Sequence, residues 1–192
     1  MDADLFSRAA RDLAAAVAEA RGAGALDARL PEGSNPSGPS QTVREAAASA
    51  AYDLAWVPDV LAGRTAEEAS PASREDDLLG EDAGVALGRL AEAAVGAAEA
   101  LDDPERTTHL SYGDFPAREY LEHVTTYYGV LALDVRAAVG TPPPDELVEG
   151  LWRQLEPGIE QWRAMGLFGQ PVDVPEGAPL VDRLRGLLGR RP

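Results

Sequence analysis

The stretch from Phe115 to Gly140 constrains the fold most, because it has the pattern of one long amphipathic helix. Its apolar side chains recur at steps of three and four, which places them on a single helical face; they are Tyr120, Val124, Tyr127, Leu131, and Val135 or Ala138. Asp114 is a suitable N-cap, Pro116 suits a first turn, and Gly140 before Thr-Pro-Pro-Pro ends the helix. Such a helix must bury its apolar face against other elements, so a helical core is expected.

Further helices are expected on both sides of this stretch. The same periodicity and the Gly and Pro punctuation predict helices over 3–20, 41–57, 83–101 and 146–161, together with a short last helix over 180–188, and they place the helical part of the long stretch at 117–138. Ser40 is the expected cap of the second helix, and Pro58 is expected to kink it or end it early. Leu13, Leu121 and Leu155 are expected in the core. The sequence therefore predicts a single all-α domain over 1–192, built as an up-and-down-type four-helix bundle with additional C-terminal helices.

Composition excludes several kinds of partner. The formal net charge is −16, and all 17 basic residues are arginine, so a phosphate backbone would be repelled and no nucleic acid is expected. Cysteine is absent, which removes disulfides, thiolate metal sites and a cysteine nucleophile. No apolar run approaches the length of a membrane span, and no secretory signal pattern is present, so no membrane partner and a cytoplasmic location are expected. The Ala, Arg and Gly richness without lysine is typical of a GC-rich genome.

Several runs resemble one family, in order and with matching spacing. The run QTVREA at 41–46 is similar to the Trp-Thr-Val-Arg-Asp-Leu signature of the mycothiol-dependent maleylpyruvate isomerase family, within the DinB-like bundle superfamily. The segment THLSYG at 108–113 resembles the loop before that family's third bundle helix. LDVRAAVG at 133–140 resembles its Trp-Asp-Leu-Ala-Arg-Ala-x-Gly, and the segments at 162–175 and 182–190 resemble its C-terminal pattern. The resemblance covers nearly the whole chain and implies a DinB-like four-helix bundle.

The resemblance also implies a metal site, and this chain departs from it there. The family holds a divalent metal with a histidine of the second helix and two ligands one turn apart in the helix over 115–140, and its activity is thiol chemistry with a small cofactor such as mycothiol. The corresponding positions here are Ser49, Tyr127 and Leu131. Zinc and similar ions prefer imidazole, thiolate and carboxylate ligands. We therefore expect neither metal nor cofactor in this chain.

The residues around these positions suggest a pocket for an organic molecule. Four side chains share one side of the second helix and are expected to face the helix over 115–140; they are Ser49, Tyr52, Asp53 and Trp56. Tyr127, as a hydrogen-bond donor, and Asp53, as an acid or base, are the catalytic candidates. The expected substrate-binding residues are Ser49, Tyr52, Trp56, Tyr128, Leu131, Asp134 and His123. The alternative is that Leu and Tyr fill the space of the lost metal, that Asp53 caps or pairs locally, and that the two histidines, His109 and His123, are structural.

Three functional hypotheses follow from the sequence. The first is a metal-independent, divergent family member that binds a small organic molecule in the bundle core, with transformation of that molecule, for example in a biosynthetic pathway, as a further step. The second is a mycothiol-dependent metalloenzyme, an isomerase or thiol transferase, with displaced ligands. The third is a non-catalytic interaction scaffold, for instance a homodimer. A cavity favours the first, bound zinc the second, and a filled core with a large apolar surface patch the third.

Overall fold

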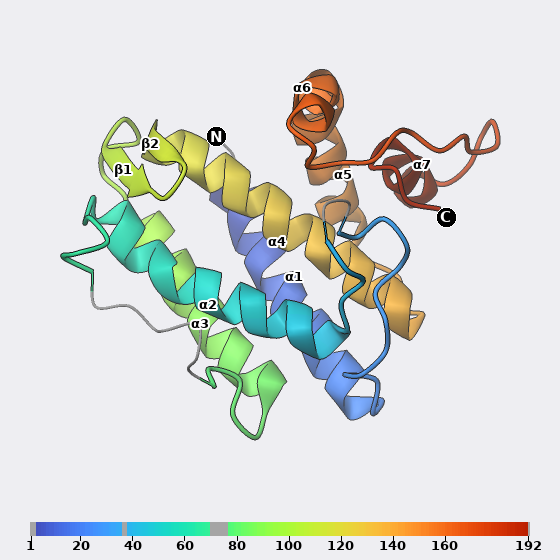
Figure 1. Ribbon diagram of the computed structural model, residues 1–192, viewed down its shortest axis with the longest axis horizontal. Coiled ribbons are helices and arrows are strands. Elements are labelled where there is room, and N and C mark those ends of the chain that lie inside the picture. Colours follow the sequence, from blue (N-terminus) through green and yellow to red (C-terminus); the bar gives the residue numbers. More distant parts are fainter. Residues whose placement is uncertain (1–2, 36–37, 70–76, 192) are drawn as a thin grey trace.

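Four long helices form the body of the protein in the computed structural model, which describes residues 3–35, 38–69 and 77–191. They are α1 (Ala3–Gly22), α2 (Val43–Leu61), α3 (Ala83–Glu99) and α4 (Ala117–Val139). Helix α1 packs against both α3 and α4, and α2 packs against α3 and, less extensively, against α4 (Figure 1). The expected all-α class is confirmed. None of the described helices has both the length and the apolar character needed to cross a membrane.

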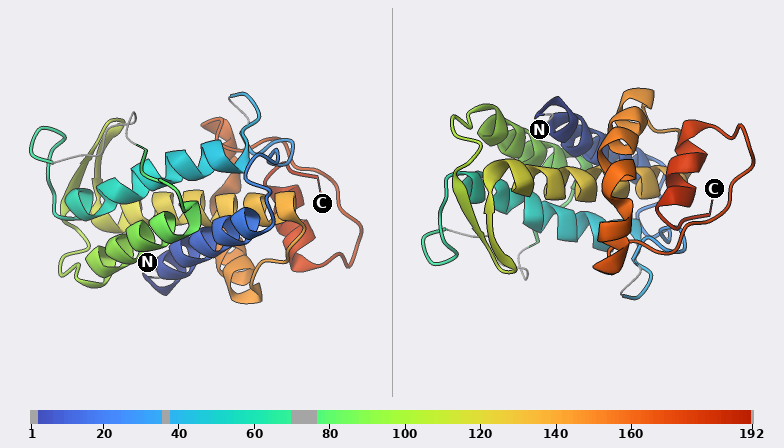
Figure 2. Two further views of the ribbon diagram at one scale, coloured as in Figure 1. Left: turned by 90° about the horizontal axis from the view of Figure 1, so that it is seen from below. Right: turned by 90° about the horizontal axis from the view of Figure 1, so that it is seen from above.

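Two smaller units are added to these helices. Strands β1 (Thr107–Leu110) and β2 (Gly113–Pro116) form an antiparallel hairpin just before α4. After α4 come α5 (Asp145–Leu155), the 3₁₀ turn η1 (Glu156–Gly158), α6 (Ile159–Ala164) and α7 (Leu180–Leu187). Seen from above, α5 and α6 run across α4, and the hairpin lies near the N-terminal end of α4 (Figure 2, right). The additions therefore enclose one side of α4.

Proline and capping residues explain where the helix boundaries differ from expectation. Thr42, and not Ser40, caps α2: its hydroxyl accepts from the Glu45 amide while the Glu45 carboxylate accepts from the Thr42 amide. The N-cap prediction for Asp114 was wrong, because that residue lies in β2 opposite His109. Pro58 does not end α2 early; it lies inside the helix. Pro157 does interrupt the helix expected over 146–161, because a residue without an amide hydrogen is accommodated in η1.

The core lies between α1 and its neighbours. Leu13, Leu121 and Leu155 are fully buried, as expected. The residues expected to form one apolar face of α4 are divided in the structure between a face that is buried in the core and a face that is partly exposed. Tyr120 and Val135 are buried in the core, whereas the Tyr127 side chain is 37% exposed. Helix α4 thus has a second face that is available for contacts outside the core.

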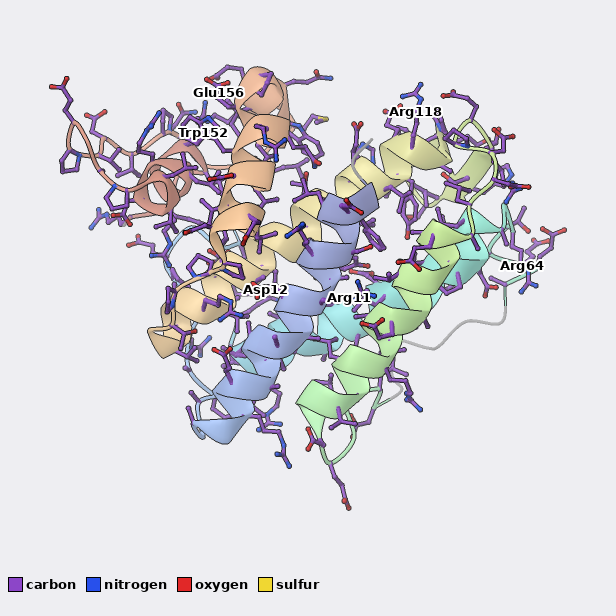
Figure 3. The ribbon with its side chains drawn as sticks, turned by 180° about the vertical axis from the view of Figure 1, so that it is seen from behind. Arg11, Asp12, Arg64, Arg118, Trp152 and Glu156 are labelled. Atoms are coloured by element: carbon purple, nitrogen blue, oxygen red, sulfur yellow. The ribbon has the colours of Figure 1, made fainter. Side chains whose placement is uncertain are left out.

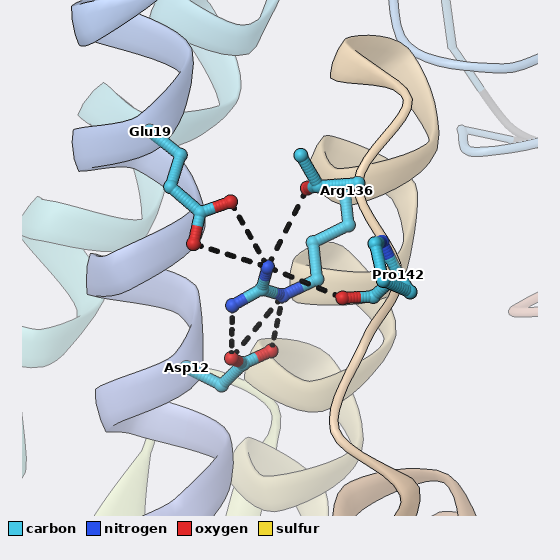
Figure 4. Close-up of polar contacts among 5 residues, drawn as sticks. Asp12, Glu19, Arg136 and Pro142 are labelled. Atoms are coloured by element: carbon cyan, nitrogen blue, oxygen red, sulfur yellow. Dashed lines mark hydrogen bonds and ion pairs between the residues drawn. The ribbon is translucent and has the colours of Figure 1, made fainter.

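A buried ion cluster joins α1 to α4. The Arg136 guanidinium lies between Asp12 and Glu19 of α1, with Nε 2.9 Å from Asp12 Oδ2 and Nη1 3.1 Å from Glu19 Oε2 (Figure 4). The same Nη1 also donates to the Pro142 carbonyl at 3.4 Å, which fixes the chain that leaves α4. On the surface between α1 and α3, Arg11 forms a second, solvent-exposed pair with Glu92 at 2.7 Å (Figure 3). Of these two contacts, the buried Arg136–Asp12 pair has the low-dielectric surroundings in which an ion pair matters strongly for stability, and the Arg11–Glu92 pair does not.

Candidate functional site

A groove with a volume of about 760 Å³ follows the second face of α4. Its α4 residues recur at steps of three and four, so they form one continuous stripe along the helix. This stripe, which we call the groove face, consists of Arg118, Glu119, Glu122, His123, Thr126, Tyr127, Val130, Leu131 and Asp134. It includes four of the residues that the sequence singles out, namely His123, Tyr127, Leu131 and Asp134. The structure therefore brings these four together along one cavity.

The other walls of the groove come from segments far apart in the sequence. The hairpin contributes Tyr112 and Phe115, and the loop before α2 contributes Leu30, Ser34 and Gln41. A backbone hydrogen bond from Val43 N to Ala28 O at 3.0 Å holds that loop against the start of α2, and one from Leu30 N to Gln41 O at 2.9 Å closes the loop on itself. The C-terminal additions supply the remaining wall, made of Gln161, Trp162, Met165, Leu167, Phe168 and Arg190. The groove exists because the hairpin and the C-terminal additions flank α4 on the side that the core does not use.

Aromatic rings line the hairpin end of the groove. The His123 ring lies 5.2 Å from the ring of Phe115 and 5.6 Å from that of Trp162, in edge-to-face arrangements. The Tyr112 ring lies 5.4 Å from that of Phe115, and Phe168 continues the series at 6.3 Å from Trp162. Such tilted and edge-to-face contacts are the favourable geometry for aromatic pairs. We call Tyr112, Phe115, His123, Trp162 and Phe168 the aromatic wall.

A buried ion pair closes the opposite end. The Asp134 carboxylate accepts from Arg190 Nε at 2.7 Å and from Nη2 at 2.9 Å, and both side chains are buried. Arg190 Nη1 donates further to the Leu188 carbonyl at 3.1 Å. Asp134 therefore lines the groove, but its charge is already used to hold the C-terminal segment against α4.

A hydroxyl without a partner lies at the same end of the groove. Ser34 Oγ is buried and has no hydrogen-bond partner in the described part of the chain. Gly33 beside it approaches Gly189 and Arg190, so the loop before α2 contacts the C-terminal segment directly. An unsatisfied buried hydroxyl costs free energy, and a bound molecule with a polar group could satisfy it.

The α2 candidates lie outside this groove. The Ser49 hydroxyl donates to the Glu45 carbonyl of its own helix at 3.2 Å. The rings of Tyr52 and Trp56 contact each other at 6.0 Å, and the buried Trp56 indole N–H lacks a partner among the described residues. Asp53 is half-buried. The small residues Ala46, Ala47, Ala50 and Ala51 of α2 are buried, and only Ala46 of these lines the groove. Ser49, Tyr52, Asp53 and Trp56 therefore do not join Tyr127 in this cavity.

Tyr128 points away from the groove face. It is fully buried, with its ring 6.2 Å from that of Phe6, and its hydroxyl has no partner in the described residues. Burial, followed by the neighbouring Tyr120 and the charge of Asp53, raises the pKa of Tyr128 well above its ordinary value. The hydroxyl is therefore neutral at physiological pH, and Tyr128 acts as a core residue here.

The side chains at the three positions implied by the resemblance do not fit a metal ion. Tyr127 and Leu131 line the groove, but a phenol and an aliphatic chain are poor ligands, and the Ser49 hydroxyl is bonded within α2. Within residues 3–35, 38–69 and 77–191, no three His, Cys, Asp or Glu side chains form a group that could hold a metal. His109 lies in the hairpin, with Nδ1 2.9 Å from Asp114 Oδ1.

Sequence reasoning missed the walls of the groove. The sequence patterns gave Phe115, Gln161, Trp162 and Arg190 no role in a site. The one local signal was the spacing of Glu119, His123, Thr126 and Val130, which repeats the helical period on a polar face. The partners of that face come from the hairpin and the C-terminus, which no local pattern connects.

No protein-family model matches this chain, and no curated protein or solved structure matches it at a significant level. The function is therefore inferred from the fold and the groove.

Proposed function

We propose that this protein binds a small organic molecule in the groove along α4, as a metal-independent, divergent relative of the mycothiol-dependent maleylpyruvate isomerase family. The observation that carries the proposal is the groove itself. Its volume of about 760 Å³ lies in the range of small-molecule pockets, which are concave and mostly apolar with a few polar groups. Tyr127, Thr126 and His123 supply such polar groups on the groove face.

Exposed apolar side chains support the same location. Among the described residues, five large hydrophobic side chains are exposed, and all except Val85 line the groove; these four are Tyr112, Tyr127, Met165 and Leu167. Isolated exposed apolar residues are common, but a cluster around one concavity indicates a binding surface. The buried, unpartnered Ser34 hydroxyl adds a polar group that a ligand would satisfy.

The family assignment rests on the resemblance, and the structure is compatible with it at the level of architecture. A body of four long helices with C-terminal additions is what the DinB-like superfamily would require. The donor set at Ser49, Tyr127 and Leu131 disfavours the thiol-dependent metalloenzyme. The experiment below distinguishes a scaffold that dimerises through the groove from a ligand-binding protein. Dilution would dissociate a dimer and expose the groove, so the dye affinity would rise, whereas the dye affinity of a monomeric ligand-binding groove would not change.

Truncation of Tyr127 tests the proposal. Nile red, a neutral dye that fluoresces in apolar surroundings, is expected to bind saturably with one dye per protein. Tyr127→Ala is expected to weaken this binding about tenfold, because it removes a large aromatic contact from the groove. The matched control is Val85→Ala, which truncates a 71% exposed side chain on α3 and should leave the affinity unchanged. Fluorescence titration at two protein concentrations measures both. Non-saturable binding, an equal loss in both variants, or an affinity that rises on dilution would contradict the proposal.

A further inference from the structure

The two arginines that line the groove are already neutralised. Arg118 Nε lies 2.6 Å from Glu105 Oε1, and Arg190 is held by the buried Asp134 carboxylate. Each guanidinium is therefore paired with a carboxylate, and the nearby Glu119 and Glu122 also stabilise the charge of Arg118. Neither offers an unpaired positive charge to a ligand, so the groove is a poor site for an anion.

Two carboxylates of the groove face have no such partner. Glu119 and Glu122 are half-buried, lie one turn apart on α4, and form no ion pair within the described part of the chain. The unpaired charge of the groove is therefore negative. The net charge of −16 of the whole chain makes the electrostatic potential around the groove more negative, which attracts cations.

The aromatic wall lies beside these carboxylates. His123 follows Glu119 by four residues and so neighbours it on the same helical face. Its ring contacts Phe115 and Trp162, whose faces are rich in π-electrons. Aromatic faces attract cations, most strongly those of tryptophan, and quaternary ammonium groups are commonly bound in this way.

We infer that the groove takes an organic cation, namely a substituted ammonium with an apolar or aromatic body. The ammonium group lies at Glu119 and Glu122, and the body lies along the aromatic wall and Tyr127. A polar group at the far end of the ligand would meet the unpartnered Ser34 hydroxyl. This inference rests on the proposed function, since it names the ligand class of the same groove.

A pair of isosteric probes tests the charge preference directly. Phenyltrimethylammonium and tert-butylbenzene have nearly the same shape and differ by one positive charge. Competition with Nile red is expected to show about tenfold tighter binding of the cation. The double variant Glu119→Gln and Glu122→Gln should abolish this preference, because it removes both charges and retains the side-chain shapes.

The control is the double variant Glu146→Gln and Glu149→Gln. These two carboxylates have the same spacing on α5 and lie outside the groove, so the variant changes net charge equally and should retain the tenfold preference. Equal binding of the two probes, tighter binding of benzenesulfonate, or an equal loss in both double variants would overturn the inference. In each case retained Nile red binding leaves the proposed function standing, whereas loss of saturable dye binding to the unmodified protein overturns both.

Discussion

Replacing Asp134 by alanine is expected to lower the free energy of unfolding by about 3–5 kcal/mol, since it leaves a buried charge without its partner. In the native protein Arg190 directs two of its N–H groups, Nε and Nη2, at the Asp134 carboxylate, and both side chains are only 3% exposed. After the substitution the guanidinium would retain the Leu188 carbonyl as a hydrogen-bond acceptor, together with its position 5.9 Å from the centre of the Phe168 ring. It would then either stay buried at a high cost or pull the C-terminal segment away from α4.

Urea unfolding followed by circular dichroism measures this effect. The matched control is Glu92→Ala, which breaks the exposed pair with Arg11 and should cost less than about 1 kcal/mol. If the two substitutions destabilise the protein equally, the Asp134–Arg190 pair is not buried in the way described.

Replacing Leu13 by alanine is expected to cost about 2–5 kcal/mol, through lost burial and the cavity left behind. Leu13 is fully buried in α1, which packs against both α3 and α4, so the neighbouring helices restrict its collapse. The same chemical change at Leu167, which is 48% exposed on the rim of the groove, should cost less than about 1 kcal/mol. Thermal and urea unfolding of both variants compare the two sites. A similar loss at both would place Leu13 outside the core.

Local pattern was enough to predict the helices, because burial on one face leaves a periodic signature. The expected ranges 83–101 and 117–138 lie close to α3 and α4, and the buried Leu13, Leu121 and Leu155 were correctly assigned. Where the helix boundaries differ from the expected ones, proline and capping residues account for the difference. Thr42 outcompetes Ser40 because Glu45 completes a capping box with it, and Pro157 divides one expected helix at η1.

The groove could be predicted only in part, because α4 is amphipathic in an unusual way. One of its faces is buried against the core, and the groove face carries polar and aromatic residues. A search for a single apolar stripe therefore assigned Tyr120, which lies in the core, and Tyr127, which lines the groove, to the same face. The predicted residues Tyr127, Leu131, Asp134 and His123 line the groove, and all four lie on α4. Ser49, Tyr52, Asp53 and Trp56 were expected to face them, from helical spacing and from the family resemblance, whereas the walls of the groove come from Phe115, Trp162 and other residues distant in sequence.

The most direct test of the groove as the binding site is a map of amide chemical-shift changes in the ¹⁵N-labelled protein on addition of phenyltrimethylammonium or Nile red. The shifts are expected to concentrate on the groove face of α4 between Glu119 and Asp134, on the hairpin, and on the segment from Gln161 to Phe168, while α3 stays unchanged. Shifts centred on Ser49 to Trp56 of α2, or spread evenly over the surface, would contradict a ligand site along α4.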